Sequence, residues 1–85
     1  MQNMRILLFS TAQCGGRQIR YSYLIEELAL EIETYGIEVE LEGERVRLPN
    51  LTSSQRRITE LLDRMARCAV TPVSARDVAE DWLLE

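Results

Sequence analysis

The side chains able to carry out acid-base or metal chemistry are few in this 85-residue sequence. Histidine, the usual general base and the commonest ligand of transition metals, is absent. The two cysteines, Cys14 and Cys68, are far apart and lack the close spacing of zinc-binding pairs. We therefore expect no catalytic residue, no metal site and no cofactor, and we expect the protein not to be an enzyme.

Glutamates at every second position are the other arrangement that chemistry could use. Glu38, Glu40 and Glu42 would share one side of a strand, where carboxylates can bind a hard cation. Arg45 and Arg47 follow at the same spacing. A solvated sheet face covered by ion pairs is therefore the favoured interpretation.

The composition of the chain limits its partners. Fourteen acidic and ten basic residues give a net charge of -4, which repels phosphate, so nucleic-acid binding is not favoured. No segment approaches the roughly eighteen apolar residues that cross a membrane, and we expect a cytoplasmic protein without a membrane partner. The hydrophobic fraction of 46% fits one globular domain over residues 1–85, which is small enough to be compatible with a homodimer.

The clearest structural pattern is the alternation of apolar and polar side chains over residues 35–48, which predicts a β-hairpin. Gly43 and Glu44 are predicted to form its two-residue turn, of type II′, because glycine adopts positive φ easily. The predicted register pairs Glu42 with Arg45 and Glu40 with Arg47 on one face, and Leu41 with Val46 and Val39 with Leu48 on the other.

Residues 17–34 fit two structures. Their apolar positions match a helical stripe, and they also match two strands, which the β-branched and aromatic residues favour. The strand interpretation places a loop at Glu26-Glu27 and puts Arg20 opposite Glu33.

The N-terminal residues complete the expected fold. Residues 5–12 are either an additional edge strand or part of a flexible N-terminus over residues 1–16. We therefore expect an α+β domain, in which a small antiparallel sheet of three or four strands is followed by two packed helices.

Capping signals predict where the two helices begin. Thr52 and Gln55 form a capping box that would open the first helix, and Ser74 would cap the second. Near the end of the second helix, Trp82 is expected to close the core by packing over the first helix or the sheet.

The first predicted helix has an apolar stripe and a charged face. On the charged face, ion pairs of i,i+4 spacing are expected between Glu60 and Arg64 and between Asp63 and Arg67. Cys68 falls on the apolar side, where a free cysteine usually acts as a small hydrophobic residue of the core.

The second predicted helix carries a candidate protein-binding surface. Asp77, Glu80 and Asp81 would lie beside an exposed edge of Trp82, and an aromatic ring surrounded by charge is a common binding hot spot. We expect charge reversal at Glu80 and Asp81 to abolish partner binding without unfolding the domain.

The first predicted helix carries an alternative surface for nucleic acid. It would consist of Arg56, Arg57, Arg64 and Arg67. Glu60 and Asp63 interrupt it, so an exposed face of ion pairs is favoured. Residues 58–83 also resemble the first two helices of a winged helix-turn-helix, but their acidic last turn has the wrong sign for phosphate.

Three motifs follow one another along residues 21–84: a Tyr21-x-Tyr23 strand, the segment Tyr35-Gly-Ile-Glu-Val39, and the ending Val70-Thr-Pro-Val-Ser-Ala-Arg-Asp-Val-Ala-Glu-Asp-Trp-Leu83. The ending is similar to Val-Ser-Pro-x-x-Leu-x-Asp-Val-x-Glu-Asp-Phe-Leu in a family of short bacterial proteins of unknown function, which the chain resembles. The resemblance implies an antiparallel sheet against two helices and no known activity. The first seventeen residues have no counterpart in it.

Together these observations favour a small non-enzymatic interaction module, an inhibitor or adaptor whose protein partner the sequence does not identify. One alternative is a phage-encoded anti-defence inhibitor of the anti-CRISPR kind. Another is a nucleic-acid-associated regulator using the arginine face, for which binding should weaken steeply with salt.

Overall fold

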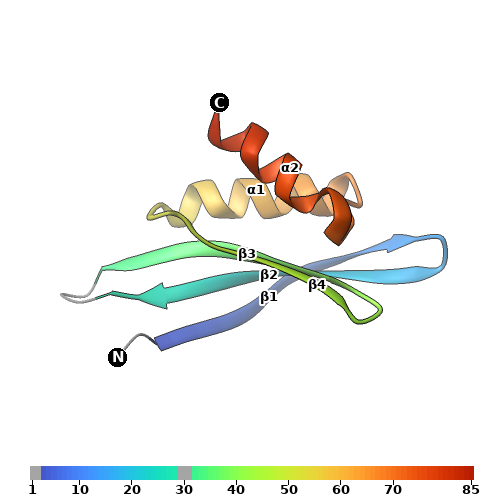
Figure 1. Ribbon diagram of the computed structural model, residues 1–85, viewed down its shortest axis with the longest axis horizontal. Coiled ribbons are helices and arrows are strands. Elements are labelled where there is room, and N and C mark those ends of the chain that lie inside the picture. The colour runs from blue at the N-terminus through green and yellow to red at the C-terminus, as the bar shows by residue number, and fades with distance from the viewer. Residues whose placement is uncertain (1–2, 29–31) are drawn as a thin grey trace.

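Four strands and two helices make up the fold of the computed structural model, which describes residues 3–28 and 32–85. In chain order they are β1 (Asn3–Cys14), β2 (Arg17–Glu27), β3 (Glu33–Leu41), β4 (Glu44–Thr52), α1 (Gln55–Arg67) and α2 (Pro72–Leu83). The strands form one antiparallel sheet in the order β1-β2-β3-β4, and both helices lie on the same face of it (Figure 1). The predicted α+β fold is confirmed, in its four-stranded form.

Residues 17–34, for which the sequence allowed a helix or two strands, belong to strands β2 and β3 in their described part. Residues 29–31 lie outside the described residues. The predicted loop at Glu26-Glu27 is wrong, because β2 continues through both residues. Arg20 lies opposite Glu40 and not opposite Glu33. This register is favoured because it brings the apolar side chains of β2 and β3 onto one face.

The core lies between this face of the sheet and the helices. Ile19 and Tyr21 of β2 are fully buried there. The Tyr21 hydroxyl donates a hydrogen bond of 2.7 Å to the carbonyl oxygen of Val70, between α1 and α2, and the Tyr23 hydroxyl lies 2.8 Å from the Thr59 hydroxyl on α1. The other buried members of the core are Ile37, Val39, Leu41, Leu48, Ile58, Leu61, Leu62, Met65, Val70, Ala75, Ala79 and Trp82.

The β3–β4 hairpin turns one residue earlier than predicted. Its central residues are Glu42 and Gly43, whose φ angles of 47° and 87° are the positive values of a type I′ turn. The prediction of a type II′ turn at Gly43-Glu44 is therefore wrong. A type I′ turn matches the right-handed twist of the strands equally well, and Glu42 adopts the positive φ that it requires. The observed pairs are Glu40 with Arg45, Glu38 with Arg47, Val39 with Val46 and Ile37 with Leu48. The predicted faces are nevertheless correct, because moving each pairing by two positions preserves the alternation.

The pairing of β3 with β4 is interrupted at Gly36. Tyr35 lies opposite Thr52 and Ile37 opposite Leu48, so residues 49–51 bulge out of the ladder. The β4 main chain approaches so closely that a Cβ on Gly36 would lie 2.6 Å from the Cα of Pro49. Only glycine leaves room for this approach.

Both helices begin at residues other than the predicted ones. Ser54 caps α1, because its Oγ accepts a 3.2 Å hydrogen bond from the N–H of Arg57, whereas the Thr52 hydroxyl accepts one from the N–H of Ser54. The predicted capping box of Thr52 and Gln55 is therefore wrong. Helix α2 begins at Pro72 and not after Ser74, because the fixed φ of proline suits the first position of a helix.

The ion pairs of α1 follow the prediction in part. Asp63 and Arg67 form the expected pair, with 3.1 Å between Oδ2 and Nε. Arg64 does not pair with Glu60, because its two terminal nitrogens donate to the carboxylate of Glu85 at 2.6 and 3.1 Å. This hydrogen bonding by Arg64 lowers the pKa of Glu85.

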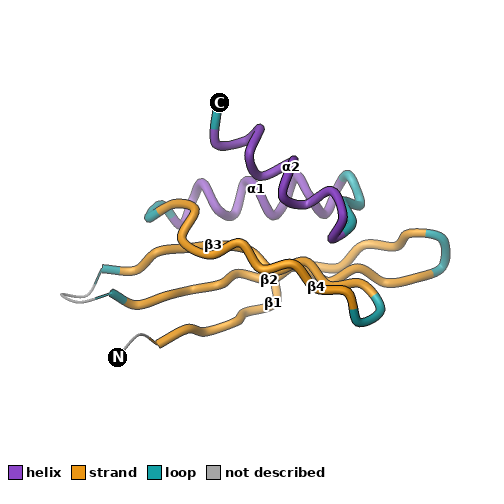
Figure 2. The backbone as a smooth tube through the Cα atoms, in the orientation of Figure 1, coloured by secondary structure: helices purple, strands orange, loops and turns teal. Residues whose placement is uncertain are grey.

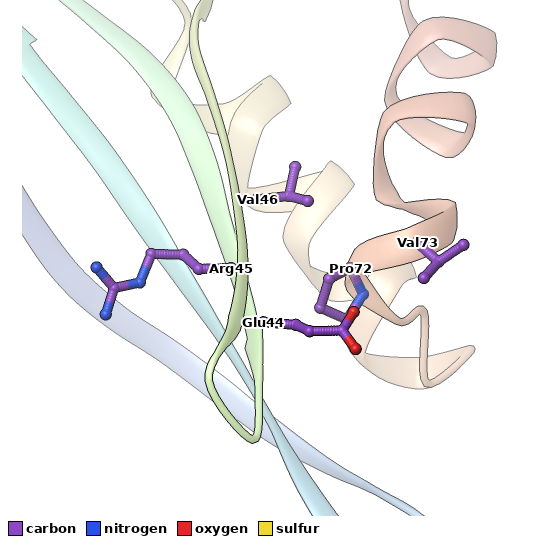
Figure 3. Close-up of a pocket in the computed structure, with 5 residues that line it drawn as sticks. All are labelled: Glu44, Arg45, Val46, Pro72 and Val73. Atoms are coloured by element: carbon purple, nitrogen blue, oxygen red, sulfur yellow. The ribbon is translucent and has the colours of Figure 1, made fainter.

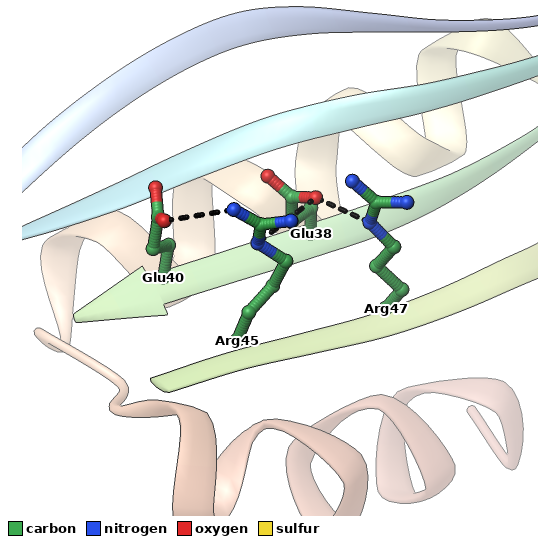
Figure 4. A network of polar contacts seen from close by, with 4 residues as sticks. All are labelled: Glu38, Glu40, Arg45 and Arg47. Carbon is green, nitrogen blue, oxygen red and sulfur yellow. Dashed lines mark hydrogen bonds and ion pairs between the residues drawn. The ribbon is translucent and has the colours of Figure 1, made fainter. Parts of the chain in front are cut away.

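The sheet face away from the helices carries a buried carboxylate. The side chain of Glu38 is only 9% exposed. Its Oε2 accepts a 2.6 Å hydrogen bond from Nε of Arg47 and lies 3.8 Å from Nε of Arg45 (Figure 4). A terminal nitrogen of Arg45 donates a 3.2 Å hydrogen bond to Oε2 of Glu40. The predicted ion pairs of this sheet face are thus present in a shifted register, but the expectation of a solvated face is wrong at Glu38, which is buried.

Replacing Gly36 with alanine should reduce the free energy of unfolding by about 1 to 3 kcal/mol, because the new Cβ must displace the β4 main chain. Urea denaturation measures the change. Gly15→Asn is the matched control, since Gly15 has positive φ and open space around it, and asparagine tolerates that conformation. Equal stabilities of the two variants would contradict the close approach.

Removing Arg47 should expose the cost of burying Glu38. We expect Arg47→Met to destabilise the protein by about 1 to 3 kcal/mol, and Glu38→Leu in the same chain to recover most of that loss. Arg56→Met, which breaks the exposed pair between Arg56 and Glu60, should cost less than about 0.5 kcal/mol. If the double variant is no more stable than Arg47→Met, the network acts through packing and not through charge.

Tyr21 should make folding sensitive to alkaline pH. Burial raises the pKa of Tyr21 to about 12, against about 10 in an unfolded chain. The unfolded state therefore loses this proton first, and the contribution of Tyr21 to stability, complete below about pH 10, falls as the pH rises from about 10 to 12. Tyr21→Phe should flatten this part of a profile of urea midpoint against pH, and an unchanged slope would assign the effect to other groups.

Candidate interaction surface

Strand β1 lies at a border of the sheet and exposes apolar side chains. It pairs with β2 on one side, and none of the described strands pairs with its other side. The exposed fractions of its N-terminal apolar residues are 48% for Met4, 47% for Ile6, 56% for Leu7 and 48% for Leu8. We call residues 3–8 the apolar border. Its outer main-chain N–H and C=O groups are available to a polypeptide that aligns with them.

The apolar border exposes side chains on both faces of the sheet. Ile6 lies opposite Leu24, on the face away from the helices, and the alternation of a strand places Met4 and Leu8 beside it. Leu7 lies opposite Tyr23, on the face that the helices cover. A partner that covered only one face of the sheet would therefore leave part of the border exposed.

The single charged residue of the apolar border is held by its own chain. Arg5 donates a 2.9 Å hydrogen bond to Oε2 of Glu33, whose Oε1 accepts one of 3.1 Å from the Tyr35 hydroxyl. Burial, followed by this hydrogen bond to Glu33, raises the pKa of Tyr35. The border therefore presents little net charge to a partner.

A bulge at Phe9 ends the apolar border. The pairing of β1 with β2 shifts between Leu8 and Ser10, and the Phe9 ring packs edge-on against Tyr23 with 5.8 Å between ring centroids. Beyond the bulge, β1 and β2 continue as a hairpin whose tip extends past the helices (Figure 2). The bulge therefore separates residues 3–8 from the rest of the outer side of β1.

Strand β4, at the other border of the sheet, is irregular toward its C-terminal end. Pro49 has no N–H to donate, and Asn50 has a positive φ of 57° that breaks the extended chain. Helix α2 also packs against this strand. Among the described strands, β1 thus combines an open border with the longer regular apolar stretch.

The acidic residues predicted to bind a partner lie on the surface of α2. Asp77, Glu80 and Asp81 are exposed and take part in none of the ion pairs of the described chain. The predicted exposed edge of Trp82 is wrong, because the residue is only 2% exposed and Arg57 lies over its ring at 4.5 Å from the centroid. Trp82 instead closes the core, as the sequence also predicted. Partner binding by the three carboxylates stays a prediction.

Each arginine of the predicted nucleic-acid face has an intramolecular partner. Arg56 pairs with Glu60, Arg64 with Glu85 and Arg67 with Asp63, whereas Arg57 covers Trp82. A phosphate would have to compete with these carboxylates for three of the four guanidinium groups. Their arrangement therefore does not form an open basic stripe.

Two open hollows on the described part of the chain are lined mainly by exposed polar and charged side chains. One of about 260 Å³ lies between the β3–β4 turn and the start of α2, where Glu44 points toward Pro72 and Arg45 points to the other side of β4 (Figure 3). A more open one of about 420 Å³ lies beside Gln55 and Thr59 on α1. Within residues 3–28 and 32–85, no group of three or more Cys, Asp or Glu residues could hold a metal ion.

The thiols and helices add two observations. Both cysteines are free, Cys14 half-buried and Cys68 exposed, so the core position predicted for Cys68 is wrong. The reason is that Cys68 follows the last residue of α1 as its C-cap, where the chain leaves the apolar face. Neither described helix is long and apolar enough to cross a membrane.

Sequence reasoning left residues 5–12 open between an edge strand and a flexible N-terminus, and it missed β1 as a surface. The available signal was the unbroken apolar run Ile6-Leu-Leu-Phe9, because a strand covered on one face would alternate as β3 and β4 do. Such a run has apolar side chains on both faces, and the position of β1 at the sheet border leaves them exposed.

Comparison with known proteins places the whole described chain in one family. The chain matches no curated protein and no solved structure. The sequence model of a family of unknown function (DUF6514) matches residues 3–85, including the N-terminal strand that the resemblance left without a counterpart. The chain, from the apolar border to the end of α2, belongs to this family of unknown function, DUF6514.

Proposed function

We propose that this protein is a non-enzymatic interaction module that binds a polypeptide along the apolar border of β1. The observation that carries the proposal is the exposure of four large apolar side chains, each about half accessible, on a strand whose outer side has no described partner. An added strand would use the free main-chain groups for affinity and the alternating side chains for specificity.

The contacts that this border offers to a partner are individually small. Covering the exposed half of one such apolar side chain contributes about 1 kcal/mol, and each new main-chain hydrogen bond contributes about 0.5 to 1.5 kcal/mol. Association costs about 4 to 15 kcal/mol. A strand of this length therefore forms a reversible complex, as an adaptor or an inhibitor does, and the partner also has to contribute apolar side chains.

The exposure of Leu7 favours a partner that pairs with the edge of β1 over a partner that covers only one face of the sheet. Leu7 is the most exposed of the four side chains, and it lies on the opposite face from Ile6. A strand aligned with β1 places side chains beside both residues, because its own side chains also alternate between the two faces.

A photoreactive amino acid in place of Leu7 should form a covalent adduct with a polypeptide when the protein is irradiated in cells that naturally encode it. We expect the adduct to disappear when Ile6 is replaced by lysine, which puts a charge into the apolar border. Gel electrophoresis and mass spectrometry detect the adduct.

The matched control is the same photoreactive residue in place of Val73, an apolar residue that is 80% exposed on α2. It should give no adduct that depends on Ile6. Adducts from position 73 alone would contradict the proposal and favour the acidic surface of α2, and circular dichroism of each variant verifies that the fold is retained.

A further inference from the structure

We propose that the polypeptide bound at the apolar border is β1 of a second copy of this chain, aligned antiparallel so that Ile6 faces Ile6. This inference rests on the proposed function and names its partner. The resulting dimer has one continuous sheet of eight strands, with the two-fold axis passing through Ile6 perpendicular to the sheet.

The alternation of side chains restricts the registers that two identical strands can adopt. Antiparallel pairing about an axis perpendicular to the sheet keeps the helices of both copies on one face, so residues of the same face must lie opposite each other. With Ile6 opposite Ile6, Met4 lies opposite Leu8 on the open face, and Arg5 lies opposite Leu7 on the helix-covered face.

The two neighbouring registers that also place residues of the same face opposite each other are less stable. Pairing Arg5 with Arg5 would oppose two like charges and place Asn3 against Leu7, and pairing Leu7 with Leu7 would extend past the bulge at Phe9. The Ile6 register keeps the two Arg5 side chains apart, and each is already paired with Glu33 of its own chain. It also uses the whole apolar part of the border.

Two further features favour a second copy over an unrelated chain. The border contains no carboxylate, so the net charge of -4 on each chain is not concentrated where the copies meet. In addition, two-fold pairing of β1 with β1 uses the same border of both copies, so association through this border closes at two copies.

Analytical ultracentrifugation of the purified chain, from about 1 to about 200 μM, tests the dimer. We expect the mass to rise from 9.8 kDa to twice that value over this range. Ile6→Lys places two ammonium groups together on the axis and should raise the dissociation constant roughly 100-fold or more. Leu83→Lys, which changes an apolar side chain of similar exposure on α2, should leave the dissociation constant unchanged.

A cysteine at position 6 tests the register and remains informative if Ile6→Lys does not fold. In a chain with Cys14→Ser and Cys68→Ser, Ile6→Cys should form an intermolecular disulfide with oxidised glutathione, which takes up the two electrons and protons as two reduced glutathione molecules. Leu7→Cys in the same background should not, because Leu7 faces Arg5.

The outcomes separate this inference from the proposed function. A chain that is monomeric throughout the range, but whose position 7 crosslinks to a different polypeptide, overturns the dimer and leaves the interaction module standing. A monomer without any adduct from position 7 overturns both. A dimer that persists in Ile6→Lys, or that crosslinks equally through Leu7→Cys, places the interface elsewhere and overturns the inference.

Discussion

The hydrogen bond from the Tyr21 hydroxyl to the carbonyl oxygen of Val70 joins the middle of the sheet to the connection between the two helices. Tyr21 is fully buried, so its hydroxyl needs a partner inside the protein, and the Val70 oxygen at the end of α1 supplies it. Two residues along β2, Tyr23 holds α1 through Thr59. These two contacts tie α1 and the connection after it to β2, and they account for the Tyr-x-Tyr spacing, because alternate residues of a strand share a face.

The helices cover one face of the sheet, and the other face is divided into two halves. At the β4 side, Arg47 donates a short hydrogen bond to the carboxylate of Glu38, and Arg45 lies 3.8 Å from it (Figure 4). At the β1 side, Ile6 and its apolar neighbours remain accessible. The charged half is ion-paired within the chain, whereas the described chain leaves the apolar half uncovered.

This division suits a chain of 85 residues. A domain of this length buries a smaller fraction of its surface than a larger domain does, so a partner that covers apolar surface also adds stability. The bulge at Phe9 interrupts the addition of a strand along β1, and the irregular segment of Pro49 and Asn50 interrupts it at the end of β4. A sheet with one open border of limited length favours a closed complex over aggregation.

The sequence by itself determined the local structure: the alternation that makes β3 and β4 strands, the apolar stripe of α1, and the faces of the hairpin. It did not determine the pairings, because Glu42-Gly43 and Gly43-Glu44 are both acceptable turns and both keep the carboxylates on one face. Only the tertiary structure decided that Trp82 is buried under Arg57, that Arg64 pairs with Glu85, and that β1 lies at a border. These features depend on contacts between residues distant in the chain, which local periodicity does not encode. The apolar run of β1 can be read in the sequence. Its exposure depends on the order of the strands, which only the whole sheet determines.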